Sequence, residues 1–239
     1  MIRYHLYLLL IIISLMKSFV DLRAVFKKVP ANKLAVSEPN PSWFGNPSNP
    51  APGVNPHWTN ENWLKSRFHF SFAEYSNPRN KNFGVLRVMN DDLVQPQRGF
   101  GEHPHRDVEI CTYIVEGNLT HKDSMGTSET LSRGAIQFMT AGSGVFHSEY
   151  NLHETDALRF IQIWIETRRR NLPPNYGSAT SVESDRQGKW AHLVSDVASS
   201  SVTPIKINQD ANIFVSEISE DSSIELVVSP GRQGKHRRH

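Results

Sequence analysis

Residues 99–109 read GFGEHPHRDVE and contain two histidines, His103 and His105, with one proline between them. Side chains at positions i and i+2 of an extended strand point to the same face of a sheet. If this stretch is a strand, both imidazoles therefore enter one space. A single pattern of this kind is more often a surface or core feature than a metal site, so it needs a second feature beside it.

Residues 145–151, VFHSEYN, provide that second feature, because His147 and Glu149 are also two residues apart. Two such strands facing each other would place three imidazoles and one carboxylate around one point. Nitrogen and oxygen ligands without a thiolate are typical of Fe, Mn, Ni, Cu or Zn at a site with room for water or substrate, rather than of structural zinc. The single cysteine of the chain excludes a disulfide framework and a zinc site built from cysteines.

The region around these stretches predicts an all-β fold. Short apolar runs alternate with glycine-containing turns, and no window of useful length has the 3.6-residue apolar period of a helix. Strands of this length and spacing are typical of a sandwich or small barrel. The predicted strands are Phe83–Met89, Ile110–Val115, Leu119–His121, Ile136–Met139, Val145–His147 and Ala157–Ile165.

A second, weaker β region follows a proline-marked segment near residue 172 and predicts a second domain. Its apolar runs are Pro204–Asn208, Asn212–Ser219 and Ile224–Val228. No partner is visible for the last run, and the polar, basic residues 229–239 are expected to form a solvated end. The second barrel therefore looks incomplete, which implies a truncated sequence or a contact with another subunit.

The N-terminal region is expected to lie outside both β domains. The apolar run Leu6–Met16 is shorter than the roughly 20 residues that span a bilayer. It fits either the core of a signal peptide or a buried apolar strand, and residues 1–24 are set aside as a candidate targeting segment. Residues 25–60 are rich in proline and asparagine and predict an extended, irregular arm. Aromatic residues should pack this arm against the body: Trp43, Phe44, Trp58 and Trp63.

Six stretches between residues 68 and 164 are long and specific: FSFAEY (70–75), LRVMNDD (86–92), GFGEHPHRDVE (99–109), YIVEG (113–117), HKDSMG (121–126) and MTAGSGVFHSEYN (139–151). In these stretches the chain resembles the pirin family of the cupin superfamily, and it is similar to the family's bacterial quercetin 2,3-dioxygenase-like members. The resemblance implies a bicupin with one metal, usually iron, in the N-terminal barrel. The ligands that it implies are His103, His105, His147 and Glu149.

The expected organisation is thus a metal-binding cupin domain over residues 61–171 and a partial C-terminal cupin domain over residues 172–239. The expected cofactor is one divalent transition metal per chain, with Fe(II) first and Mn, Ni, Cu and Zn as alternatives.

Glu109 is a competing carboxylate. It stands after His105 at the spacing from which many cupins take their carboxylate ligand, H-x-H-x(3–4)-E. The pirin pattern takes it from the His-Ser-Glu tripeptide instead, so we expect Glu149 to be the ligand and Glu109 to be a neighbouring acid. His121, as an outward polar group on a strand, and His153, in a polar loop, are expected to be structural.

Two functions fit such a site. The first is a metal-dependent oxygenase that binds a flavonol such as quercetin together with O₂ and cleaves the flavonol ring, with Glu149 as the acceptor of a substrate hydroxyl proton. The second is a non-enzymatic, metal-dependent co-regulator that docks on transcription factors. The similarity to the quercetinase-like members favours the oxygenase by analogy.

The expected partners are therefore a small aromatic or polyphenol substrate and O₂, with protein partners if the chain is a regulator. The 26 lysines and arginines balance 24 acidic residues, which gives no indication of direct nucleic-acid binding. No transmembrane span is predicted. Asn118-Leu119-Thr120 is a glycosylation sequon, yet a free cysteine and a reduced metal fit an intracellular or organellar protein with an unmodified Asn118.

Overall fold

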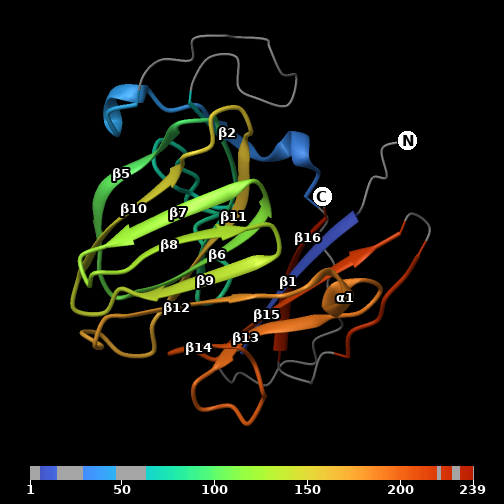
Figure 1. Ribbon diagram of the computed structural model, residues 1–239. Helices are drawn as coiled ribbons and strands as arrows, with labels where there is room; N and C mark the ends of the chain where they lie inside the picture. Colours follow the sequence, from blue (N-terminus) through green and yellow to red (C-terminus); the bar gives the residue numbers. More distant parts are fainter. Residues whose placement is uncertain (1–5, 15–28, 47–62, 220–221, 228–231, 239) are drawn as a thin grey trace.

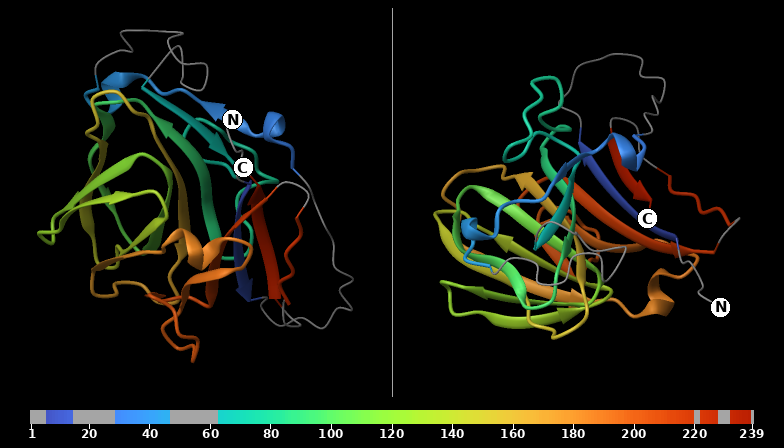
Figure 2. Two further views of the ribbon diagram at one scale, coloured as in Figure 1. Left: turned by 45° about the vertical axis from the view of Figure 1, so that its right-hand side comes forward. Right: turned by 90° about the horizontal axis from the view of Figure 1, so that it is seen from above.

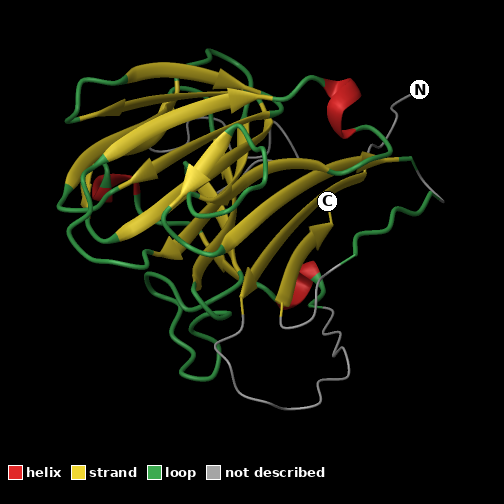
Figure 3. Cartoon of the chain, turned by 90° about the horizontal axis from the view of Figure 1, so that it is seen from below, coloured by secondary structure: helices red, strands yellow, loops and turns green. Residues whose placement is uncertain are grey.

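The computed structural model describes residues 6–14, 29–46, 63–219, 222–227 and 232–238. Strands dominate this part of the chain (Figures 1 and 3), and its single α-helix is one turn, α1 (Glu183–Arg186). The predicted all-β fold is thus confirmed. The strands form three open sheets of four, seven and five strands rather than closed barrels.

Two of the sheets enclose the histidine-containing stretches. The four-stranded sheet has the order β5–β10–β7–β8, with bounds β5 (Arg98–His105), β7 (Asn118–Asp123), β8 (Ser128–Ser132) and β10 (Val145–Asn151). The seven-stranded sheet has the order β12–β9–β6–β11–β4–β3–β2. Its bounds are β2 (Ala35–Ser37), β3 (Leu64–Phe68), β4 (Leu86–Val94), β6 (Val108–Glu116), β9 (Ala135–Thr140), β11 (Leu158–Glu166) and β12 (Asn175–Thr180).

The central strands of the seven-stranded sheet are buried on both faces, which explains why β6, β9 and β11 are nearly continuous apolar runs. Ile114 and Phe160 pack between it and the four-stranded sheet. Cys111 and Ile163 pack on its other face. Successive side chains of β6 and β11 therefore enter two different cores, because side chains alternate along a strand. The left view of Figure 2 shows the layers.

The five-stranded sheet, β14–β13–β15–β1–β16, covers that second face. Its bounds are β1 (Leu6–Ser14), β13 (Ala191–Asp196), β14 (Ile205–Ile207), β15 (Ala211–Ile218) and β16 (Arg232–Arg238). The N-terminal apolar run is thus a strand, β1, antiparallel to β15 and lying between β15 and β16 (Figures 1 and 2). The remainder of the candidate targeting segment lies outside the described residues.

The C-terminal part corrects two expectations. Residues 222–227 form no strand, although Ile224–Val228 was predicted to be one. The basic end, expected to be solvated, instead forms β16, which pairs antiparallel with β1. Strand pairing uses backbone groups, and lysine and arginine are common on edge strands because they discourage further pairing. Apolar content therefore predicted a strand where none forms and missed the strand β16.

The arm before the first large sheet is short of regular structure, as predicted, over its described residues 29–46. Two 3₁₀ turns, η1 (Ala31–Lys33) and η2 (Pro41–Trp43), flank β2. The Phe44 ring packs edge-on against Trp63, with centroids 5.7 Å apart, whereas Trp43 is exposed. Aromatic anchoring is thus confirmed for Phe44 and Trp63 and wrong for Trp43, and Trp58 lies outside the described residues.

Candidate metal centre

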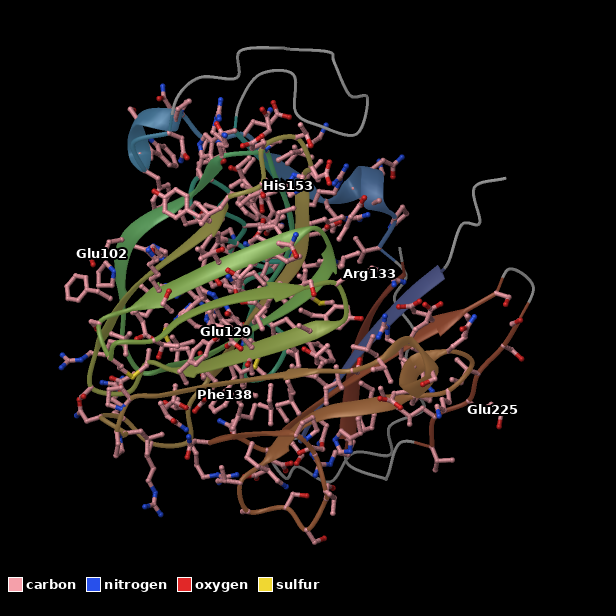
Figure 4. All side chains as sticks on the ribbon, viewed as in Figure 1. Glu102, Glu129, Arg133, Phe138, His153 and Glu225 are labelled. Atoms are coloured by element: carbon pink, nitrogen blue, oxygen red, sulfur yellow. The ribbon has the colours of Figure 1, made fainter. Side chains whose placement is uncertain are left out.

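Three imidazoles converge on the inner face of the four-stranded sheet. His103 and His105 lie on β5, and His147 lies on β10 directly opposite His103. The centroids of the three rings are 4.6 to 4.8 Å apart. Neighbouring residues face outward: Pro104 is exposed, and Glu102 lies on the outer side of β5 (Figure 4). Strand alternation therefore gathers the three histidines in one space.

The ring nitrogens in this space have few partners besides one another. Nδ1 of His103 donates a hydrogen bond to the carbonyl oxygen of Gly101 (2.7 Å), which leaves the lone pair of the neutral ring on Nε2. That Nε2 is 3.1 Å from Nε2 of His147, while Nδ1 of His147 is buried without a hydrogen-bond partner. Converging imidazole nitrogens of this kind fit a metal ion, which binds the unprotonated ring.

Burial keeps these rings neutral. Desolvation lowers the pKa of His103, lowers that of His105 to about 3 and lowers that of His147 to about 2. Repulsion from the neighbouring imidazoles adds to the last two shifts. Protons therefore compete weakly for the ring nitrogens at neutral pH, so the lone pairs are available to a cation.

Glu149, two residues after His147, is held by a row of polar residues on the seven-stranded sheet. Nε2 of Gln137 donates to Oε1 (2.7 Å), and Nε2 of Gln162 donates to Oε2 (2.8 Å). The Thr112 hydroxyl lies 3.3 Å from Oε1. Thr112 stands opposite both glutamines in the sheet register, so the three form one continuous row, here called the polar row.

The sequence analysis missed the polar row. Each of its members interrupts an apolar run at a position facing the four-stranded sheet, and all three are buried. A lone polar residue in the middle of a buried strand needs a hydrogen-bond partner. That pattern, repeated on β6, β9 and β11, was the available signal.

The candidate ligand atoms form two overlapping groups, and Glu149 belongs to only one of them. The ligand atoms of His103, His105 and His147 lie within 4.8 Å of one another, and so do those of His121, His147 and Glu149. His147 belongs to both groups. Desolvation raises the pKa of Glu149 to about 7, against the opposing effect of its three hydrogen bonds to the polar row.

His121 corrects an expectation, because it points inward and not outward. It lies on β7 opposite Glu149 and is completely buried. Its Nε2 is 2.9 Å from Oδ2 of Asp123, and its ring stacks on Tyr176 with centroids 4.5 Å apart. The alternation of β7 could have placed it: Leu119 and His121 share a face, and Leu119 is core.

Glu109 lies on the opposite face of the seven-stranded sheet. Its carboxylate accepts hydrogen bonds from the Thr140 hydroxyl (2.8 Å) and from the Asn208 side-chain amide (3.0 Å) near the five-stranded sheet. Odd-numbered residues of β6 face that side, as Cys111 does. Burial raises the pKa of Glu109 despite these hydrogen bonds. Glu109 is thus separated from the imidazoles by the backbone of β6. His153 lies in the loop between β10 and β11 and is exposed, as expected.

A cavity of about 570 Å³ opens beside His103 and His105, and we call it the metal-side cavity. Aromatic and aliphatic side chains form much of its wall, and charged residues lie among them. Its lining residues are Ser71, Phe72, Arg87, Val88, His103, Pro104, His105, Arg106, Asp107, Val108, Trp164 and Glu166. A larger hollow of about 700 Å³, near Phe138 and Lys206, contains none of the site residues.

Among the described residues, no helix is long and apolar enough to cross a membrane. The pirin family model, described as "Pirin", matches residues 53–165. A pirin-like protein of Caulobacter vibrioides is 40% identical over 172 residues, which are 72% of this chain and 73% of that protein. Quercetin 2,3-dioxygenase of Escherichia coli K12 is 42% identical over 159 residues, or 65% of each chain.

A crystal structure of the E. coli bacterial pirin YhhW in complex with nickel(II) superposes with a TM-score of 0.61 at 34% identity. The superposition covers 77% of this chain and 68% of that one. The chain thus spans about two thirds of the length of the E. coli proteins that it matches. Residues 53–165, which the family model matches, contain the three imidazoles, Glu149 and the polar row. From its fold, its site and these similarities, the chain belongs to the pirin family.

Proposed function

We propose that His103, His105, His147 and Glu149 hold one divalent transition metal. The convergence of three neutral imidazole rings carries this proposal: Nε2 of His103 faces Nε2 of His147 at 3.1 Å, and Nδ1 of His147 is buried without a hydrogen-bond partner among the described residues. Glu149 supplies a carboxylate from the same strand as His147. Among the described residues only Gln162 donates to Oε2, so that oxygen keeps a free lone pair, whereas Gln137 and Thr112 both contact Oε1. His121, grouped with His147 and Glu149, is the alternative donor if the metal lies deeper.

We propose Fe(II) as the metal, with Mn, Ni, Cu and Zn as alternatives, because nitrogen and oxygen donors suit all five. The related E. coli pirin contains nickel(II) in its crystal structure, so the ligand set alone does not select iron. All four proposed ligands fall within residues 61–171, the segment that we propose as the metal-binding domain.

We propose further that the chain is an oxygenase of the quercetin 2,3-dioxygenase type, acting on a flavonol and O₂. A metal bound at this site would polarise chelating oxygens of the substrate and supply the one-electron chemistry that O₂ requires. Phe72 and Trp164, which pack edge-on with centroids 5.2 Å apart, form an aromatic wall of the metal-side cavity on which a planar ring can lie. The similarity to the E. coli quercetin 2,3-dioxygenase supports this substrate class.

The residues of this chain orient the substrate and manage its proton. Trp164 packs edge-on against His105, with centroids 4.8 Å apart, and thus holds that imidazole at the cavity wall. Glu149 is the proposed acceptor of the substrate hydroxyl proton at its Oε2 atom, which accepts from Gln162. The polar row keeps that carboxylate within reach throughout.

The test is oxygen uptake by the metal-loaded protein. Protein reconstituted anaerobically with Fe(II) should bind quercetin with a shift in the flavonol absorption band, and should consume O₂ once air is admitted. Parallel samples with Mn, Ni, Cu and Zn identify the active metal. Quercetin binding without oxygen uptake for every metal would contradict the oxygenase and support the metal-dependent regulator.

A further inference from the structure

The rim of the metal-side cavity contains two arginines in different electrostatic states. Arg87 lies 3.5 Å from the carboxylate of Glu166, and Nη1 of Arg87 also donates to the carbonyl oxygen of Lys81. Its charge is therefore largely balanced within the protein. Arg106 immediately follows the metal-binding tripeptide and lines the same cavity, but its partner is an uncharged group.

Arg106 is held in place by the backbone of the turn before β10. Its Nε and Nη2 both donate to the carbonyl oxygen of Ser143, at 3.1 and 2.8 Å. Within the described part of the chain, no carboxylate forms an ion pair with it. The neighbouring Asp107 instead accepts a hydrogen bond from the backbone amide of Asn171 (2.6 Å). Arg106 therefore presents a fixed guanidinium with an unbalanced charge and free N–H groups at the cavity rim.

We infer that the metal-side cavity binds an aromatic ligand that bears an anionic group, such as a carboxylate, in addition to the oxygens that chelate the metal, and that Arg106 recognises this group. The inference rests on the proposed metal site and deepens it by naming the substrate class. Phe72 and Trp164 provide the aromatic walls. A guanidinium that is already immobilised loses little side-chain entropy when an anion binds, so it contributes more affinity than a free surface arginine.

The test compares two ligands of nearly equal shape, 3,4-dihydroxybenzoate and 3,4-dihydroxybenzamide. Both chelate through the catechol oxygens, and only the first carries a charge on the opposite side of the ring. Zn(II)-loaded protein is used because zinc supports no redox turnover. Dissociation constants are measured by titration calorimetry for the wild type, for Arg106→Gln and for the control Arg169→Gln, an exposed arginine that does not line the cavity. The zinc content of every sample is measured first.

Wild type and Arg169→Gln should bind the benzoate about tenfold more tightly than the benzamide, the size expected of one charge-assisted hydrogen-bonded pair. Arg106→Gln should bind both ligands equally, at the affinity of the benzamide. Equal affinities in the wild type, a preference that survives in Arg106→Gln, or no binding of either ligand to fully zinc-loaded protein would overturn the inference. Failure of the wild type to retain zinc would instead contradict the proposed metal site.

Discussion

Replacing Gln137 by methionine should weaken metal binding although Gln137 touches no metal. Methionine keeps the length and approximate shape of the side chain but cannot donate a hydrogen bond. Nε2 of Gln137 makes the shortest contact to the Glu149 carboxylate, at 2.7 Å to Oε1, and a second contact of 3.2 Å to the Thr112 hydroxyl. The substitution therefore leaves Glu149 with one good donor, Gln162, instead of two.

The size of the effect follows from the charge on the acceptor. A hydrogen bond to a charged group contributes about 1.5–3 kcal/mol, and about 1.4 kcal/mol corresponds to a factor of ten in affinity. We expect the metal dissociation constant to rise by about 10- to 100-fold, the range seen when groups behind a metal ligand are removed. The assay is competition with a chromophoric chelator at pH 7, using Ni(II) or Zn(II).

The matched control is Ser178→Ala. Ser178 stands opposite Gln137 on β12, but its hydroxyl donates to Glu129 and not to Glu149. This variant should bind metal like the wild type. An unchanged metal affinity in a folded Gln137→Met protein would refute the reasoning, because the polar row would then not act on the ligand. Equal losses in both variants would point to general destabilisation of the sheet.

Three further outcomes are expected. Glu149→Gln should lower metal affinity by at least about tenfold, whereas Glu109→Gln should leave most of it intact, because Glu109 lies on the other face of β6. Chelator competition on the two variants measures both affinities. A larger loss in Glu109→Gln than in Glu149→Gln would exchange the roles of the two carboxylates. In metal-free protein, burial raises the pKa of Glu149 to about 7. The protonated carboxyl group therefore contributes to the free energy of unfolding in full below its unfolded pKa, and this contribution is lost as the pH rises through 7. Urea unfolding should show the advantage of Glu149→Gln over wild type growing from pH 5 to pH 8, and a pH-independent difference would contradict the burial argument. Protein from its native cells should show no mobility shift after treatment with an N-glycosidase, and a clear shift would place Asn118 in the secretory pathway.

Strand alternation alone predicts that His103 and His105 share a face, and likewise His147 and Glu149, whereas the two pairs meet only because β10 pairs with β5. Alternation along β6 also separates Glu109 from the imidazoles, because Glu109 shares a face with Cys111. The polar row could not be assembled from the sequence, since Thr112, Gln137 and Gln162 meet only through the register of three strands that are distant along the chain. His121 was misplaced because the inward face of its strand was not identified from Leu119, which shares that face.

The five-stranded sheet was harder to predict for a different reason. β1 and β16 come from the two ends of the chain and pair with each other, so no local pattern connects them. The basic character of β16 also hides a strand whose stability comes from backbone pairing at an edge. The apolar run at residues 6–14 allowed two interpretations, and only its partners in the fold distinguish them.

The metal content of His147→Ala tests the central claim most directly. His147 belongs to both groups of candidate ligand atoms, so its removal should abolish binding wherever the metal lies among them. Elemental analysis of wild-type protein should give one divalent transition metal per chain, and the same analysis of His147→Ala should give essentially none. Stoichiometric metal in folded His147→Ala protein would contradict the assignment of this site.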